Sequence, residues 1–173
     1  EPERVGRLAL VEGLGPLGGS AESAGTRLRE AVAARRALEA RRDDPPRVIP
    51  TVAAALTARL MATPMRPEDA ERIVRRNLRA VDGGFVWRSD PRLRLPSSTR
   101  LPESAIRSIL AAIDAPTLLI AASPPPPYFT PQQRAARAAC VRDLRIEEIE
   151  GGHHLHMERA EVVGPLLRAF LAA

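Results

Sequence analysis

The segment 142–171 constrains the fold of this chain most, because it reads as a strand, a tight turn and a helix. Residues 142–149 alternate between polar and apolar side chains, as in a strand, and residues 162–171 repeat apolar side chains with a helical period. Between them, Gly151 and Gly152 let the backbone turn sharply before His153. In open α/β sheets, reactive side chains lie at such turns, at the carboxyl ends of strands. The sequence therefore predicts an α/β fold with His153 in such a position.

Two further segments, residues 5–11 and 114–122, read as strands, and the first of them reads as a buried one. The first ends at Glu12, which is followed by a Gly-Leu-Gly-Pro turn. From Pro116 onward, strands and helices alternate in the way that right-handed crossovers of a parallel sheet require. We therefore expect Glu12 and His153 at the same edge of one parallel sheet.

The region between these strands has a helical pattern. Residues 23–42, 51–61 and 67–80 each read as a helix, and proline with acidic residues opens the third. The bulky apolar side chains available in this region include Met61, Phe85 and Trp87. Such side chains are more often plain core than the lining of a pocket, and both interpretations stay open.

Several of these segments resemble the α/β-hydrolase superfamily. The strand, the Gly-His turn and the last helix resemble the end of such a hydrolase, where the histidine is the general base. Residues 115–120 read as its seventh strand, and residues 83–94 resemble the segment by which a helical cap returns to the core in the serine-hydrolase-like group. The resemblance implies a hydrolase core at residues 1–17 and 96–173 and a helical cap at residues 18–95.

The resemblance also indicates a catalytic acid. After the seventh strand, where the family often has Asp, this chain has Ser123, four prolines and Tyr128, without a carboxylate. Haloalkane-dehalogenase-like members hold the acid after the sixth strand instead, and Glu12 occupies that position. The resemblance thus implies His153 as base and Glu12 as acid. The alternative is that Glu12 caps its turn or pairs with an arginine.

The family also needs a serine on a Gly-x-Ser-x-Gly elbow, and this sequence contains none. We therefore interpret the chain as the carboxyl-terminal half of a hydrolase, inert by itself. The expected partners are an amino-terminal half or a second copy, and the expected substrate is a small ester-like molecule. Met61, Phe85, Trp87 and His154 are the candidate substrate-binding residues. The resemblance implies no cofactor. A non-catalytic remnant or binding module is the alternative function.

Metal and nucleic-acid binding are less favoured by the sequence. His153, His154 and His156 invite a zinc ion, but no fourth ligand has recognisable spacing, and we expect no metal. The net charge is +5, yet all 26 basic residues are Arg, which looks like a GC-rich coding bias rather than a surface for nucleic acid.

The remaining expectations concern the compartment of the cell. The single Cys140 excludes an internal disulfide and favours a reducing compartment. No apolar run has the roughly 20 residues of a membrane span, and no signal peptide is recognisable at the start. We therefore expect a cytoplasmic protein without membrane contact. The start at Glu1 without Met fits processing or a fragment of a longer chain.

Overall fold

The computed structural model describes all 173 residues and divides into two compact units. Unit 1 contains residues 1–21 and 100–173, and unit 2 contains residues 22–99. The sequence leads us to expect the boundaries after residues 17 and 95, a few residues earlier in each case.

Unit 1 is built on a parallel sheet of three strands. After a short 3-10 turn, η1 (Pro2–Arg4), the strands are β1 (Leu8–Val11), β4 (Thr117–Ser123) and β5 (Leu144–Glu150), in the order β1-β4-β5. Leu10 of β1 pairs with Leu119 of β4, and Leu119 pairs with Ile146 of β5, both in parallel register. The parallel α/β class predicted from the sequence is therefore confirmed.

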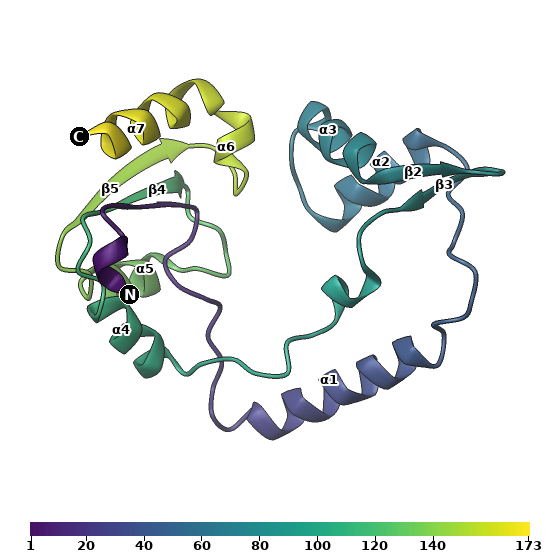
Figure 1. Cartoon of the computed structure of the whole chain (residues 1–173), viewed down its shortest axis with the longest axis horizontal. Coiled ribbons are helices and arrows are strands. Elements are labelled where there is room, and N and C mark those ends of the chain that lie inside the picture. Colours follow the sequence, from purple (N-terminus) through teal and green to yellow (C-terminus); the bar gives the residue numbers. More distant parts are fainter. The chain divides into compact units, whose positions relative to one another are not determined.

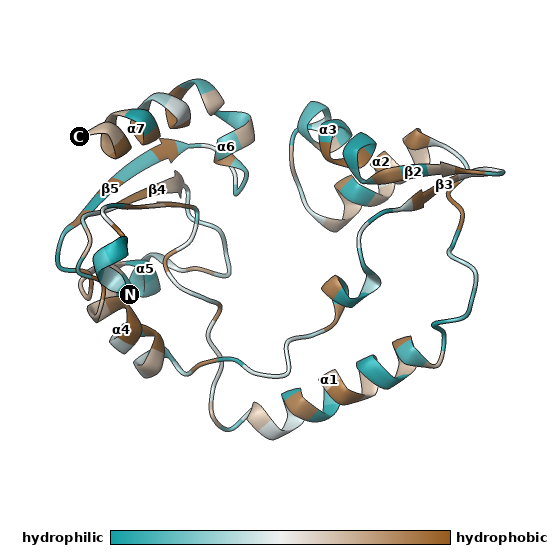
Figure 2. Ribbon diagram, in the orientation of Figure 1, coloured by the Kyte–Doolittle hydropathy of each residue, from teal (hydrophilic) through white to brown (hydrophobic).

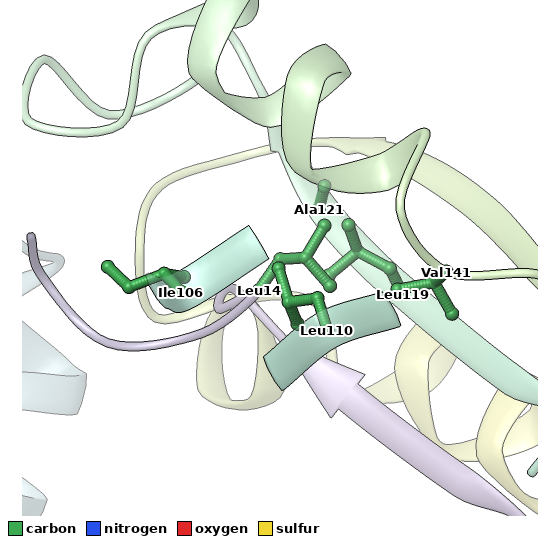
Figure 3. Packing of buried hydrophobic residues seen from close by; sticks show 6 residues of the cluster. All are labelled: Leu14, Ile106, Leu110, Leu119, Ala121 and Val141. Carbon is green, nitrogen blue, oxygen red and sulfur yellow. The ribbon is translucent and has the colours of Figure 1, made fainter. Parts of the chain in front are cut away.

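Helices cover both faces of this sheet (Figure 1). The first face packs on α4 (Glu103–Ala111) and α5 (Pro131–Ala138), and the second on α6 (Leu155–Glu158) and α7 (Ala160–Ala172). The buried residues of the first face are Leu14, Ile106, Leu110, Leu119, Ala121 and Val141 (Figure 3). Those of the second face are Leu118, Ile120, Ala122, Ile149, Leu155 and Val163.

Strand β4 is the centre of unit 1, because its successive side chains enter both cores in turn. Leu119 belongs to the first face and Leu118 and Ile120 to the second, and all three are at most 1% exposed. A strand that is buried on both faces reads as a continuous apolar run, which is why it was legible in the sequence. Figure 2 shows β4 as mainly hydrophobic, whereas β5 has long hydrophilic stretches.

Strand β1 has a hydrogen-bonded neighbour on one side only. It begins at Leu8 rather than at Val5, which is 48% exposed and lies outside the ladder. On its other side, the backbone N–H and C=O groups of β1 are therefore not paired with any strand of this chain.

Unit 2 contains α1 (Ala24–Glu39), α2 (Val52–Ala62) and α3 (Pro67–Asn77), followed by the hairpin of β2 (Leu78–Val81) and β3 (Gly84–Trp87) and by the 3-10 turn η2 (Pro91–Arg94). The three helices are confirmed, but the third ends at Asn77 rather than at residue 80. Its last predicted residues form β2 instead, because Asp82 and Gly83 make a two-residue turn that pairs them with β3.

The core of unit 2 joins the hairpin to α2 and α3. Ala55, Val74 and Leu78 are buried, and Phe85 and Trp87 pack against them. Phe85 also exchanges two backbone hydrogen bonds with Ile49, of 2.7 and 2.9 Å. The helical region is therefore completed by a hairpin that the sequence analysis did not predict.

Candidate active site

Glu12 and His153 meet at the carboxyl edge of the unit 1 sheet. His153 Nδ1 lies 3.2 Å from Glu12 Oε2, although the two residues are 141 positions apart in the sequence. Glu12 directly follows β1, His153 follows β5, and the parallel strand β4 lies between them. The Glu12 side chain is 5% exposed and that of His153 is 46% exposed. A buried carboxylate thus contacts an imidazole that solvent can reach.

The backbone of β4 positions Glu12. The N–H of Glu12 donates to the carbonyl of Ile120 at 2.9 Å, and Glu12 Oε1 accepts a hydrogen bond from the N–H of Ala122. Glu12 has a φ of 56°, a backbone conformation that residues other than Gly rarely adopt. This conformation ends the strand and accompanies the return of the side chain to β4, so that Oε2 is left for His153.

Three hydrogen bonds fix the turn that carries His153. Gly151 donates to the carbonyl of Ser123 at 3.3 Å, Gly152 donates to Glu158 Oε2 at 2.7 Å, and Arg159 Nη1 donates to the carbonyl of Glu150 at 2.9 Å. A Cβ at Gly152 would lie 3.0 Å from the nearer oxygen of Glu158. The second glycine therefore lets the carboxylate approach the backbone closely.

Tyr128 is a neighbour of this pair that the sequence analysis did not single out. Its ring meets the His153 ring edge to face, with centroids 5.7 Å apart and an interplanar angle of 89°. Burial and the negative charge of Glu12 raise the pKa of the Tyr128 hydroxyl above its usual value of 10.0. No local motif marks Tyr128, because the proline segment before it reads only as a rigid loop.

The other histidines lie close to His153. The His154 ring centroid is 5.3 Å from that of His153 and 6.0 Å from that of His156. No group of three or more His, Cys, Asp or Glu side chains is arranged to hold a metal ion.

The candidate substrate-binding residues of unit 2 lie in different environments. Met61 is 83% exposed, whereas Phe85 and Trp87 are half-buried against the cluster around Val74. Their role in substrate binding, like that of His154, stays a prediction.

A cavity of about 10 Å³ lies beside the acid. A space of this size holds about one water molecule and no substrate. Its lining comes from the turn after Glu12, from β4, from the proline loop (residues 124–129) and from α5, and consists of Glu12, Gly13, Leu119, Ala121, Pro125, Pro126, Phe129 and Arg134.

The geometry of the pair defines its chemical capability. When Nδ1–H of His153 donates to the carboxylate, Nε2 carries the lone pair and can accept a proton. The buried carboxylate also stabilises the imidazolium that forms. An imidazole next to a buried carboxylate at the carboxyl edge of a parallel sheet is also how α/β hydrolases arrange their catalytic base and acid.

Comparisons with solved structures identify the fold. A hypothetical protein from Pseudomonas aeruginosa PAO1 matches with a TM-score of 0.84 and 34% identity, over 99% of this chain and 61% of that protein. The thioesterase domain from the curacin biosynthetic pathway matches with a TM-score of 0.75 and 22% identity, over 97% of this chain and 59% of that domain. An esterase from Mycobacterium tuberculosis matches with a TM-score of 0.59 and 24% identity, over 96% of this chain and 56% of that enzyme.

The chain therefore has part of the α/β-hydrolase fold. The chain spans between 56% and 61% of the lengths of these three proteins. No protein-family model and no curated protein matches the sequence. None of the helices has both the length and the apolar character needed to cross a membrane.

Proposed function

We propose that this chain supplies the base and the acid of an ester-hydrolysing enzyme that works with a Ser-His-acid triad. The hydrogen bond between His153 Nδ1 and Glu12 Oε2, 3.2 Å long, is the observation that carries the proposal. Glu12 is buried and held by the N–H of Ala122, so its position does not depend on a mobile surface side chain.

In the proposed reaction, His153 Nε2 takes the proton of a serine hydroxyl as the serine oxygen attacks the ester carbonyl. The tetrahedral intermediate collapses, the imidazolium gives its proton to the leaving alcohol, and an acyl-enzyme remains. Water then attacks the acyl-enzyme by the same steps and releases the acid. Throughout, Glu12 keeps His153 in one tautomer and stabilises its positive charge.

The serine and the oxyanion hole belong, in this proposal, to a segment outside residues 1–173. The sequence has no Gly-x-Ser-x-Gly elbow, and the chain spans only 56–61% of the three similar proteins. The unpaired side of β1 gives such a segment a strand to pair with. The cavity beside Glu12, of about 10 Å³, is too small for a substrate, which also supports a pocket completed by other residues. The segment can be part of the same polypeptide or of a second one.

The experiment combines intact-mass spectrometry of the native protein with labelling by a fluorophosphonate, which reacts with activated serines. We expect a nucleophile-bearing segment to be present and its serine to be labelled. Glu12→Gln should lower kcat on a chromogenic ester by about 10³–10⁴-fold, since the imidazole loses the carboxylate that orients it. Glu147→Gln makes the same chemical change on β5, where Glu147 pairs with Arg145 at 2.7 Å, and should leave kcat unchanged.

Two outcomes would contradict the proposal. An unchanged rate in Glu12→Gln would move the acid to another residue. A fluorophosphonate that labels no serine, even with the nucleophile-bearing segment present, would favour the non-catalytic binding module.

A further inference from the structure

Arg137 is a buried charged side chain to which the proposed mechanism gives no role. It lies on α5, and only 4% of it is exposed. A buried guanidinium is unfavourable unless its donors and its charge are matched by partners. The partners of Arg137 therefore indicate what it holds together.

Glu103 at the start of α4 neutralises the charge. Arg137 Nε donates to Glu103 Oε1 at 2.9 Å, and Nη2 donates to Oε2 at 2.8 Å. These hydrogen bonds hold the pKa of the Glu103 carboxyl below its ordinary value of 4.5. The two-pronged pair fixes the plane of the guanidinium, and therefore the direction of its remaining N–H groups.

The remaining nitrogen, Nη1, binds the turn at residues 13–16, which directly follows the proposed catalytic acid Glu12 and is called the acid turn below. It donates to the carbonyl of Leu14 at 2.9 Å and to that of Pro16 at 3.0 Å. Between them, Gly15 has a φ of 85°, and a Cβ there would lie 3.0 Å from Ile106 and 3.5 Å from Nη1. The turn begins directly after Glu12, so the position of the carboxylate depends on how this turn is held.

The same guanidinium also contacts the proline loop. Its carbon lies 5.2 Å from the centroid of the Phe129 ring, within the range of a cation–π interaction. Phe129 follows Tyr128, whose ring contacts His153 with centroids 5.7 Å apart. The Arg137 side chain thus contacts two loops next to the His153 imidazole. One of them follows Glu12, and the other carries Tyr128.

We infer that Arg137 and Glu103 are positioning residues, which hold the acid turn and the proline loop at the separation that the Glu12–His153 hydrogen bond requires. This inference rests on the proposed function for its effect on catalysis. Arg137 uses four of its five N–H donors in this arrangement. Lysine has the same charge, but it lacks the planar geometry to bind Glu103 with two prongs and both carbonyls at once.

The test compares Arg137→Lys and Glu103→Gln with Arg142→Lys in the assembled enzyme. Arg142 is the matched control, because it pairs with Asp114 at 3.5 Å on the exposed surface of the same unit. The readouts are kcat, KM and the downfield proton resonance of the His153 Nδ1–H. Arg137→Lys and Glu103→Gln should each lower kcat by about 10–100-fold with KM little changed, since a displacement of about 1 Å at a reacting group has an effect of this order. Both should also broaden or abolish the resonance, and Arg142→Lys should change none of the three readouts.

A folded Arg137→Lys or Glu103→Gln variant with wild-type kcat and an intact resonance would overturn the inference. If Arg137→Lys does not fold, Glu103→Gln decides, because it leaves Arg137 in place but removes the negative charge and one of the two acceptor oxygens that fix the plane of the guanidinium. If the assembled wild-type enzyme hydrolyses no ester, the proposed function fails. The Nδ1–H resonance then still decides whether Arg137 and Glu103 position the Glu12–His153 pair.

Discussion

Glu12 joins more parts of the candidate site than any other residue. Its backbone continues the β1 ladder, one carboxylate oxygen accepts from Ala122, and the other contacts His153. Because each oxygen has a different partner, the carboxylate cannot rotate without losing one of them. Its negative charge also raises the pKa of Tyr128. This effect can be measured independently of catalysis.

The pKa of Tyr128 should fall towards 10.0 in Glu12→Gln. Burial and the charge of Glu12 both raise this pKa, and the substitution removes the second cause while it keeps the first. Absorbance titration, corrected with Tyr128→Phe, measures the change. Glu147→Gln, on the exposed edge of β5, serves as the control and should have no effect. An unchanged Tyr128 pKa in Glu12→Gln would mean that the two side chains are farther apart than in the structure.

The ionisation of Glu103 should make the stability of unit 1 depend on pH. Hydrogen bonding to Arg137 lowers its pKa below 4.5, so the unfolded state binds more protons than the folded state around that pH. The pair therefore contributes fully above pH 4.5, and its contribution is lost as the pH falls through the lowered pKa. Because the Glu103 side chain is 35% exposed, solvent screens the pair and we expect a contribution of only about 1 kcal/mol.

The comparison of wild type with Glu103→Gln measures this contribution. Urea unfolding at about pH 6 should show the larger difference in unfolding free energy between the two proteins, and acidic solution should reduce it. A difference that is the same at both pH values would contradict the prediction.

Among the elements, the turn between β5 and α6 determines where His153 lies. The end of β5 is fixed by the ladder with β4, which extends to the pair of Ser123 and Glu150. Leu155, the first residue of α6, is fully buried in the second core. The two glycines that connect these fixed ends have little freedom to change.

Gly151→Ala should destabilise unit 1 by about 1–3 kcal/mol. A Cβ at Gly151 would lie 2.8 Å from Leu155 Cδ2, and its φ of 157° is one that other residues rarely adopt. Gly164→Ala on α7 is the matched control, because a Cβ there meets nothing within 4 Å. It should change the free energy of unfolding by less than about 0.5 kcal/mol, because the gain from alanine in a helix is opposed by the crowding of its Cβ against the following Pro165. Thermal unfolding measures both, and equal effects of the two substitutions would refute the steric account.

At the scale of the whole molecule, the sheet of unit 1 is open at β1. An edge strand with unpaired N–H and C=O groups is a template for a further strand. The residues of β1 are only half-buried in this chain, so its sides as well as its edge are available for further packing. Both features are expected of a strand that has a second neighbour in the complete fold.

Residues 1–173, expressed alone, should therefore associate with copies of themselves. Sedimentation over a range of concentrations should show dimers or larger species. Co-expression with the nucleophile-bearing segment should replace them by a single defined complex, because that segment occupies the edge. A folded chain that stays monomeric at all concentrations would contradict this expectation.

Most elements of the chain and their order could be predicted from the sequence. The continuous apolar run at residues 117–122 predicted a strand, and Glu12 and His153 were placed correctly after the ends of their strands. It did not predict the β2–β3 hairpin, because the last residues before Asp82 continue a helical pattern and their pairing depends on a partner strand. Periodicity and turn residues act over a few positions, and such local signals identify strands, helices and sharp turns.

Only the tertiary structure decided which side chains meet. The contact between Glu12 and His153 spans 141 positions, and that between Arg137 and the Leu14 carbonyl spans 123. The parallel sheet aligns the ends of β1 and β5, and the packing of α4 and α5 then brings Glu103, Arg137 and the proline loop to the acid turn. No local pattern encodes such contacts, because they depend on how far each strand and helix extends before it packs. The sequence therefore identified the candidate base and the candidate acid, whereas the tertiary structure brought the two together and supplied the residues around them.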